Sequence, residues 1–172
     1  MKERNGSLGL APIETHNQRK PAILTIRRAD ISDLPALTDL FDGYRQFYEQ
    51  PSDLAGARSF LTERLTKQDS VIFVAEDAPF LQGFTQLYPS FSSTRMARIF
   101  ILNDLFVSPR ARKKGVAAAL LSAAADYAEG KGAIRLTLST AHGNAAAQAL
   151  YQREGWIRDD HFQTFNLSLP RL

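Results

Sequence analysis

The clearest change of hydrophobic period along the chain falls between residues 99 and 127. The apolar run from Ile99 to Val107 is rich in β-branched and aromatic residues, and it ends at Ser108 and Pro109, where a proline cannot donate to a ladder. Beyond Gly115, apolar residues recur at positions 116, 120, 123 and 127, which is the spacing of one helix face. This pattern predicts a buried strand that leads through a short basic loop into a helix.

The other periodicities predict a mixed sheet with helices packed on it. Strand patterns occur at residues 22–27, 71–76, 81–88, 98–107 and 133–139, with a closing hairpin of residues 156–158 and 162–169. Spacings of three and four predict helices over about 34–48, 53–65, 116–130 and 145–153. A right-handed crossover would place strand 133–139 parallel to strand 98–107. We therefore expect an α+β protein of α/β/α layers, with a mostly antiparallel sheet of six to seven strands and about four helices.

Composition narrows the class of protein. The 172 residues suit one domain; residues 1–21 show no periodicity, so we expect a flexible tail there and a single domain at 22–172. The chain has no apolar run of bilayer length and no signal-like stretch, which predicts a cytoplasmic protein that binds no membrane. It has no cysteine and only three scattered histidines, which excludes an acyl-cysteine intermediate and predicts no metal site. The net charge of +3, without a basic stripe carrying aromatics, argues against nucleic-acid binding.

The basic loop between the central strand and its helix is a candidate anion site. A strand that turns into a helix directs unpaired N–H groups, and the positive end of the helix dipole, at one point. Arg110, Arg112, Lys113 and Lys114 add four cations beside it. Gly115 allows a positive φ and leaves room for a phosphate, although it could also be an ordinary glycine at a helix start. The spacing fits neither the nucleotide-hydrolase loop nor the dinucleotide fingerprint.

Two motifs give the chain a family resemblance. Residues 112–117, Arg-Lys-Lys-Gly-Val-Ala, resemble the Q/R-x-x-G-x-G/A loop of the GNAT superfamily of acyl-CoA-dependent N-acetyltransferases, in which position 117 is often Gly and commonly Ala. Asn144, followed by Tyr151 and then Gly155 and Trp156, is similar to that family's second signature. The resemblance covers roughly residues 23–168. It implies a sheet that splays between two central parallel strands, and transfer of an acetyl group from acetyl-CoA to a primary amine of a small molecule by direct attack in a ternary complex.

The resemblance also implies how acetyl-CoA would be held. The strand backbone would pair with the pantetheine arm and face the thioester oxygen, the loop amides would cradle the pyrophosphate, and the last helix would contribute two side chains. Asn144 could instead serve only as a helix cap. The implied cofactor-binding residues are Leu105, Phe106, Val107, Arg112, Lys113, Lys114, Gly115, Val116, Ala117, Ala118, Asn144 and Tyr151.

Tyr151 looks like the family's general acid. A phenol with a pKa of about 10 can donate a proton to a thiolate whose conjugate acid has a pKa of about 8.5. The same position on a helix is also that of an ordinary half-buried core tyrosine. Both interpretations stay open at this point.

Two carboxylates are candidates for the general base. Alternation puts Asp104 on one strand face with Phe100, Leu102 and Phe106, where burial should raise its pKa and let it accept a proton directly or through water. Asp104 could equally bind a substrate ammonium or accept a structural hydrogen bond. Glu76 is the second candidate, although acids at strand ends are usually solvated.

The acceptor pocket is the part that the sequence specifies least. In the family, the loop between the first two helices commonly shapes this pocket, and aromatic and acidic side chains suit a cationic amine. The candidate substrate-binding residues are Tyr44, Tyr48, Glu49, Gln86 and Tyr88, of which Tyr44 and Tyr48 could instead be core residues. Three alternatives stay open: a catalytically silent acyl-CoA-binding sensor or regulatory module, an acetyltransferase acting on protein N-termini or lysines, and an RNA-binding loop. A homodimer is also possible, since many relatives pair.

Overall fold

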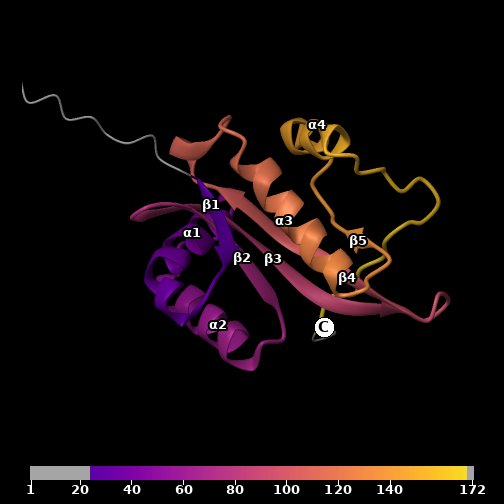
Figure 1. Ribbon diagram of the computed structural model, residues 1–172, viewed down its shortest axis with the longest axis horizontal. Helices are drawn as coiled ribbons and strands as arrows, with labels where there is room; N and C mark the ends of the chain where they lie inside the picture. Colours follow the sequence, from indigo (N-terminus) through magenta and orange to yellow (C-terminus); the bar gives the residue numbers. More distant parts are fainter. Residues whose placement is uncertain (1–23, 170–172) are drawn as a thin grey trace, which may run out of the picture.

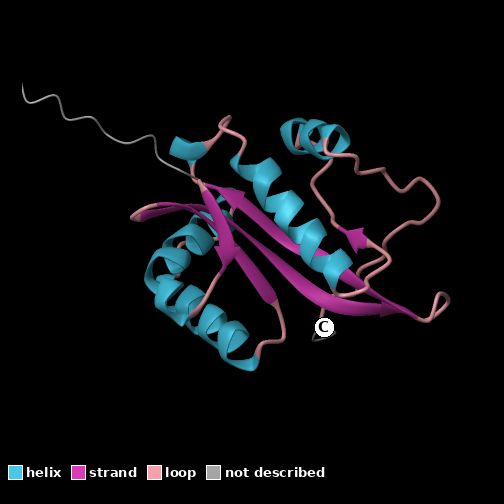
Figure 2. Ribbon diagram, in the orientation of Figure 1, coloured by secondary structure: helices cyan, strands magenta, loops and turns pink. Residues whose placement is uncertain are grey.

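The computed structural model describes residues 24–169 and places helices on both faces of a five-stranded sheet (Figures 1 and 2). The strands, in sheet order, are β1 (Thr25–Arg28), β2 (Val71–Asp77), β3 (Phe80–Ser92), β4 (Ala97–Val107) and β5 (Leu136–Thr137). The helices are α1 (Leu34–Phe47), α2 (Leu54–Lys67), α3 (Val116–Gly130) and α4 (Ala145–Arg153), with short 3-10 turns η1 (Ile31–Asp33) and η2 (Pro109–Ala111). Neighbouring strands are antiparallel except β4 and β5, which are parallel.

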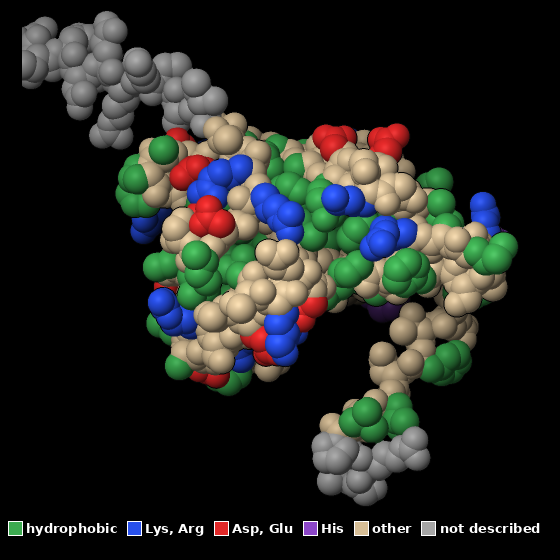
Figure 3. Space-filling model, turned by 60° about the horizontal axis from the view of Figure 1, so that its bottom comes forward, with side chains coloured by type: hydrophobic (Ala, Val, Ile, Leu, Met, Phe, Trp, Pro, Cys, Tyr) green, Lys and Arg blue, Asp and Glu red, His purple; other side chains and the backbone are tan. Residues whose placement is uncertain are grey.

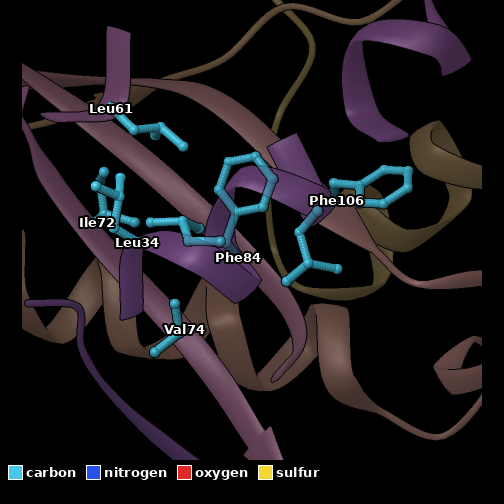
Figure 4. Close-up of a cluster of buried hydrophobic side chains, with 8 residues drawn as sticks. Leu34, Leu61, Ile72, Val74, Phe84 and Phe106 are labelled. Carbon is cyan, nitrogen blue, oxygen red and sulfur yellow. The ribbon is translucent and has the colours of Figure 1, made fainter. Parts of the chain in front are cut away.

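Each face of the sheet has its own hydrophobic core. Under α1 and α2, the rings of Phe84 and Phe106 pack with Leu61, Ile72 and Val74 (Figure 4). The opposite face packs against α3 and α4, with members from β2 to β4 and from both helices, namely Val71, Leu87, Phe100, Leu102, Leu121, Ala124, Ala128, Leu150 and Tyr151. The predicted α/β/α layering is therefore confirmed.

A β-bulge in β4 changes which side chains face which layer. Gln86 pairs with Asp104 but Leu87 pairs with Leu102, so Asn103 is the extra residue. Phe100 and Leu102 lie in the α3 core, whereas Phe106 lies in the α1 core. The expectation that Phe100, Leu102, Asp104 and Phe106 share one face was wrong, because simple alternation assumes an unbroken ladder.

The two parallel strands are paired only at their start. Phe100 pairs with Leu136 and Ile101 with Thr137, after which β4 continues to Val107 paired only with β3. The open edge of β4, residues 102–107, therefore lies next to the N-terminus of α3. This is the opening that the family resemblance implied between the two central parallel strands.

The closing hairpin predicted at residues 156–158 and 162–169 is wrong. Residues 154–169 contain no strand, so the sheet has five strands within the described range rather than six to seven. Phe165 and Leu167 are 88% and 66% exposed, and Figure 3 shows this segment leading away from the body of the molecule. The alternation of apolar and polar residues is typical of a strand. A strand here would have to pair with β5, which is only two residues long and provides almost no backbone groups for pairing. The predicted tail, residues 1–21, lies outside the described residues.

Candidate active site

Asp104 is buried on the α1 side of the sheet, beside the open edge of β4. Its exposed fraction is 4%, and the amide of Asn103 donates to its carboxylate, with Nδ2 and Oδ1 3.1 Å apart. Burial raises the pKa of Asp104, and hydrogen bonds from the Tyr44 hydroxyl and the Asn103 amide offset part of that rise. Asp104 is thus a stronger base than a solvated carboxylate. The direction of this shift agrees with the prediction, although Asp104 lies on the opposite face of β4 from Phe100 and Leu102.

Tyr44 and Tyr88 lie near this carboxylate, and Tyr48 and Tyr151 lie near Tyr44. We call these four tyrosines, together with Asp104, the tyrosine cluster. The ring of Tyr44 lies edge-on to that of Tyr48, with centroids 5.2 Å apart, and its hydroxyl reaches the Asn103 carbonyl at 3.5 Å. Burial, and then the charge of Asp104, raise the pKa of Tyr44, and the same two causes raise the pKa of Tyr88 to about 12. Burial, with Tyr48 as a second cause, raises the pKa of Tyr151. Tyr44, Tyr88 and Tyr151 are therefore protonated hydrogen-bond donors at neutral pH.

Tyr151 comes to the cluster from the opposite layer. Asn144 caps α4 by accepting from the Ala147 amide at 3.2 Å, as the capping interpretation of this residue predicts. The helix ends at Arg153, Gly155 follows the cap with a φ of +83°, and the Trp156 amide donates to the Tyr151 carbonyl at 2.9 Å. This turn lays the Trp156 ring against Tyr151, with centroids 6.1 Å apart. The spacing of the second signature thus fixes where the Tyr151 ring lies.

Of the other residues predicted to bind the acceptor, Gln86 is buried, whereas Tyr48 and Glu49 are exposed. Gln86 is fully buried, and it pairs with Asp104 in the β3–β4 ladder. Its Nε2 donates to the Ser70 hydroxyl at 2.8 Å. Glu49 is exposed in the turn that ends α1, with a φ of +61°. Tyr48 is 42% exposed and lies at the rim.

Glu76 is not brought to this cluster. Its carboxylate accepts from Nε of Arg27 at 2.8 Å, and Arg27 also binds Asp33. In the sheet, Glu76 pairs with Leu81 on β3, whereas Asp104 pairs with Gln86 on that strand. Its carboxylate belongs to an ion-pair network with Arg27 and Asp33, near the start of β3.

The loop before α3 has the geometry of an anion site. Lys113 and Gly115 have φ values of +60° and +80°, and no side chain among the described residues caps α3. Ala119 is the first residue of α3 whose amide reaches a helical carbonyl, that of Gly115 at 3.0 Å, which leaves the amides of Val116, Ala117 and Ala118 available. A Cβ on Gly115 would meet nothing within 4 Å, so the space beside it is open. These groups fit a pyrophosphate.

The open edge of β4 offers a second set of backbone groups. The Ser108 amide donates to the Gln82 carbonyl on β3 at 2.8 Å, and backbone groups alternate along a strand. The N–H and C=O groups of Leu105 and Val107 therefore point away from β3, toward the opening, while those of Phe106 point to β3. Of the three strand residues predicted to pair with pantetheine, Leu105 and Val107 have the right orientation.

Arg112 is placed differently from the lysines that follow it. Its Nε donates to the Val107 carbonyl at 3.1 Å. Its guanidinium lies over the rings of Phe47 and Phe106, 5.9 and 5.8 Å from their centroids. Arg112 therefore covers the end of β4 on the α1 side, while Lys113 and Lys114 are exposed on the loop.

Sequence reasoning missed the residue that holds the α1–α2 connection. Asp42 is 3% exposed, and its carboxylate accepts from the Asp53 amide at 2.8 Å and from the Ser52 hydroxyl at 2.7 Å. Arg45 and Gln46 donate to it as well, and these bonds lower its pKa. Its position among the apolar residues of a helical face was the only available signal. Asp42 thereby fixes the end of α1, which carries Tyr44 and is capped by Tyr48.

Comparison with known proteins identifies the family. The model of the acetyltransferase (GNAT) family matches residues 35–156. The chain belongs to this family. An N-acetyltransferase of Bacillus subtilis (strain 168), YhfO, described as uncharacterized, is 52% identical over 147 residues, which cover 86% of this chain and 99% of the relative. The crystal structure of a probable acetyltransferase superposes with a TM-score of 0.79 at 39% identity, covering 86% of this chain and 99% of that one.

A more distant GNAT structure shares the fold. It is the aminoglycoside N-acetyltransferase AAC(6')-Iy in complex with CoA, with a TM-score of 0.71 at 20% identity over 86% of this chain and 97% of that one. Together, these comparisons confirm the expected GNAT fold and identify this GNAT protein as an acyltransferase. Among residues 24–169 no helix is both long and apolar enough to cross a membrane, and no three metal-binding side chains gather in one place.

Proposed function

We propose that this GNAT protein transfers the acetyl group of acetyl-CoA to a primary amine of a small molecule, by direct attack within a ternary complex. One observation carries the proposal: the open edge of β4 has the free amides of α3 at one end and the tyrosine cluster beside it. A donor that lies along the edge would meet an acceptor that sits on the cluster.

The backbone would hold the donor. The C=O of Leu105 and the N–H of Val107 can pair with a pantetheine arm, as a further strand would, while the Val107 carbonyl already accepts from Arg112. The amides of Val116, Ala117 and Ala118, at the positive end of the α3 dipole, suit the pyrophosphate, and Lys113 and Lys114 add charge nearby. The N–H of Leu105 would also stabilise the thioester oxygen as negative charge develops on it.

The two catalytic roles fall to Asp104 and Tyr151. Asp104 accepts a proton from the acceptor ammonium, directly or through one water, because burial has made its carboxylate more basic. Nitrogen then attacks the thioester carbon, the C–S bond breaks, and the electron pair leaves with sulfur. Tyr151, protonated at neutral pH, donates its proton to that sulfur, and the second proton, which the attacking nitrogen loses as the amide forms, restores the Tyr151 hydroxyl. The remaining tyrosine hydroxyls orient the amine.

The decisive experiment follows acetyl-CoA turnover by thiol release with pooled primary amines, and detects the acetylated product by mass. Tyr151→Phe should lower kcat and kcat/KM together by about 100-fold, because it removes an interaction made at the reacting sulfur. Calorimetry should show acetyl-CoA affinity within about twofold of the wild type.

Two outcomes would contradict this proposal. Acetyl-CoA binding without turnover of any amine would indicate a sensor module instead of an enzyme of small amines. A fully active Tyr151→Phe variant would remove Tyr151 from the proposed role while leaving the transfer reaction in place.

A further inference from the structure

Arg112 has binding capacity that the fold does not use. Its Nε–H is taken by the Val107 carbonyl, but no carboxylate among residues 24–169 lies within 4.0 Å of its guanidinium. Two aromatic rings, those of Phe47 and Phe106, hold the planar group in place. The N–H groups of its two terminal nitrogens remain available, and their planar arrangement suits a carboxylate bound through two hydrogen bonds.

Arg112 lies on the α1 side of the sheet, where we propose that the acceptor binds. Phe106 belongs to the core under α1 and α2, at its margin with 8% exposure (Figure 4), and it follows Asp104 by two residues on the same strand face. Phe47 ends α1, and its ring lies edge-on to Tyr48 with centroids 5.2 Å apart. Arg112 therefore stands at the rim of the tyrosine cluster, on the side of the sheet away from α3.

The α1 side of the opening thus carries a buried anion and an exposed cation. Asp104 is the carboxylate of the cluster, and Arg112 is exposed beside Phe47, which is itself 52% exposed. An acceptor ammonium would be attracted to Asp104, whereas a second ammonium near the rim would be repelled by Arg112. A carboxylate at the rim would instead gain charge-assisted hydrogen bonds.

We propose that the acceptor is an amine that also carries a carboxylate, with its ammonium at Asp104 and its carboxylate on the guanidinium of Arg112. This inference rests on the proposed function and narrows its substrate class. Arg112 then selects acceptors instead of binding the donor pyrophosphate, and the pocket disfavours diamines.

The test compares three acceptors of one chain length: 4-aminobutyrate, its uncharged amide, and 1,4-diaminobutane. We expect the wild type to prefer 4-aminobutyrate over the amide by about tenfold in kcat/KM. Arg112→Gln should lower kcat/KM for 4-aminobutyrate about tenfold, change the amide by no more than about twofold, and raise the rate with the diamine. Arg112→Lys, which keeps the charge but loses the fork, should fall between these two.

Arg110→Gln is the matched control. Arg110 is exposed in the same loop, so this variant removes one charge while leaving the rim intact, and it should keep the wild-type ratio. Calorimetry with acetyl-CoA separates the two roles of Arg112: unchanged affinity in Arg112→Gln supports acceptor selection. A preference that survives in Arg112→Gln, or an equal loss for all three acceptors with weakened acetyl-CoA binding, would overturn the inference. A wild type that acetylates the amide and the diamine as well as 4-aminobutyrate refutes only this inference, whereas no turnover with any amine refutes the proposed function.

Discussion

Asp104 owes its environment to the residue before it. Because Asn103 is the bulged residue of β4, the Asp104 side chain turns toward α1 and away from α3. The Thr85 hydroxyl then donates to the Asp104 carbonyl at 2.8 Å, which satisfies a backbone group beside the irregular ladder. One inserted residue thus moves a carboxylate to the layer where the tyrosines lie.

Replacing Asp104 with Asn tests its role as base. Asn keeps the shape but cannot take a proton, so the variant can use only amine that is already deprotonated in solution. We expect kcat/KM to fall about 100-fold at pH 7, and the deficit to shrink as the pH approaches the amine pKa of about 10. The wild type should lose activity as the pH falls through the raised pKa of Asp104, whereas the variant should lack that limb.

The measurement is the pH profile of kcat/KM with one amine for both proteins. Tyr151→Phe serves as the comparison, since it lowers activity without removing a carboxylate. Parallel profiles for the wild type and Asp104→Asn would show that Asp104 only positions the ammonium.

At the scale of elements, the start of α3 depends on the left-handed conformation of its N-cap, Gly115. Gly115 has a φ of +80°, and a Cβ there would touch nothing, so replacing it with Ala costs backbone strain alone. We expect Gly115→Ala to lower the free energy of unfolding by about 1–2 kcal/mol. The strain should also shift the loop, and acetyl-CoA affinity should fall about tenfold by calorimetry.

Gly130→Ala provides the control within the same helix. Gly130 is the last residue of α3, has no positive φ, and would also place a Cβ in open space. It should leave acetyl-CoA affinity unchanged and should not destabilise the protein. Equal acetyl-CoA affinity in both variants would mean that the loop conformation does not matter for binding.

Most elements could be predicted because their own residues determine them. The period of the apolar residues predicted α3 over residues 116–130 and α4 over 145–153, and both bounds agree with the structure. The change of period also predicted the strand that leads through a loop into α3, and the structure has β4 and α3 in this order. The opening beside Leu105 and Val107 was implied only by the family resemblance, and their role in binding stays a prediction.

What could not be predicted depends on partners distant in sequence. The bulge at Asn103 is a property of the β3–β4 pairing, so alternation within β4 alone put Phe100 and Asp104 on the same face. The closing hairpin failed for a related reason: its alternation describes a strand, but no neighbouring ladder accepts it. The stacking of Arg112 on Phe47 likewise joins residues far apart in the chain.

In the whole molecule, the sheet separates two layers that meet at the opening. Tyr44 belongs to α1 in one layer, whereas Tyr151 packs with the α3 core in the other. Tyr151 is nevertheless among the groups that raise the pKa of Tyr44, and Tyr48 is among those that raise the pKa of Tyr151, so these hydroxyls lie near one another. They can do so because β5 pairs with only two residues of β4 and leaves the rest of that edge open. The short β5 is therefore what allows one site to draw on both layers.

An ion-pair network connects the start of α1 to the sheet. Its members are Arg27 on β1, Glu76 on β2 and Asp33, which directly precedes α1. Arg27 on β1 binds both carboxylate oxygens of Asp33 at 2.8 and 2.7 Å, and Asp33 also accepts from the Asp30 amide at 2.9 Å. The Arg27 guanidinium holds the pKa of Asp33 below its usual value, and Asp33 is 8% exposed. Because this pKa is depressed in the folded state, its contribution to stability is present above about pH 4 and is lost as the pH falls through the folded value.

Replacing Asp33 with Asn should therefore lower the free energy of unfolding at pH 7 by about 1–2 kcal/mol. The difference from the wild type should shrink below about pH 4, since protonation removes the same ion pair from the wild type. Urea denaturation followed by circular dichroism at several pH values between 7 and 3 measures both curves. Asp39→Asn, the same substitution at an exposed position of α1, should leave stability and its pH dependence unchanged. Curves for Asp33→Asn and the wild type that stay parallel down to pH 3 would show that the ion pair with Arg27 does not connect α1 to the sheet energetically.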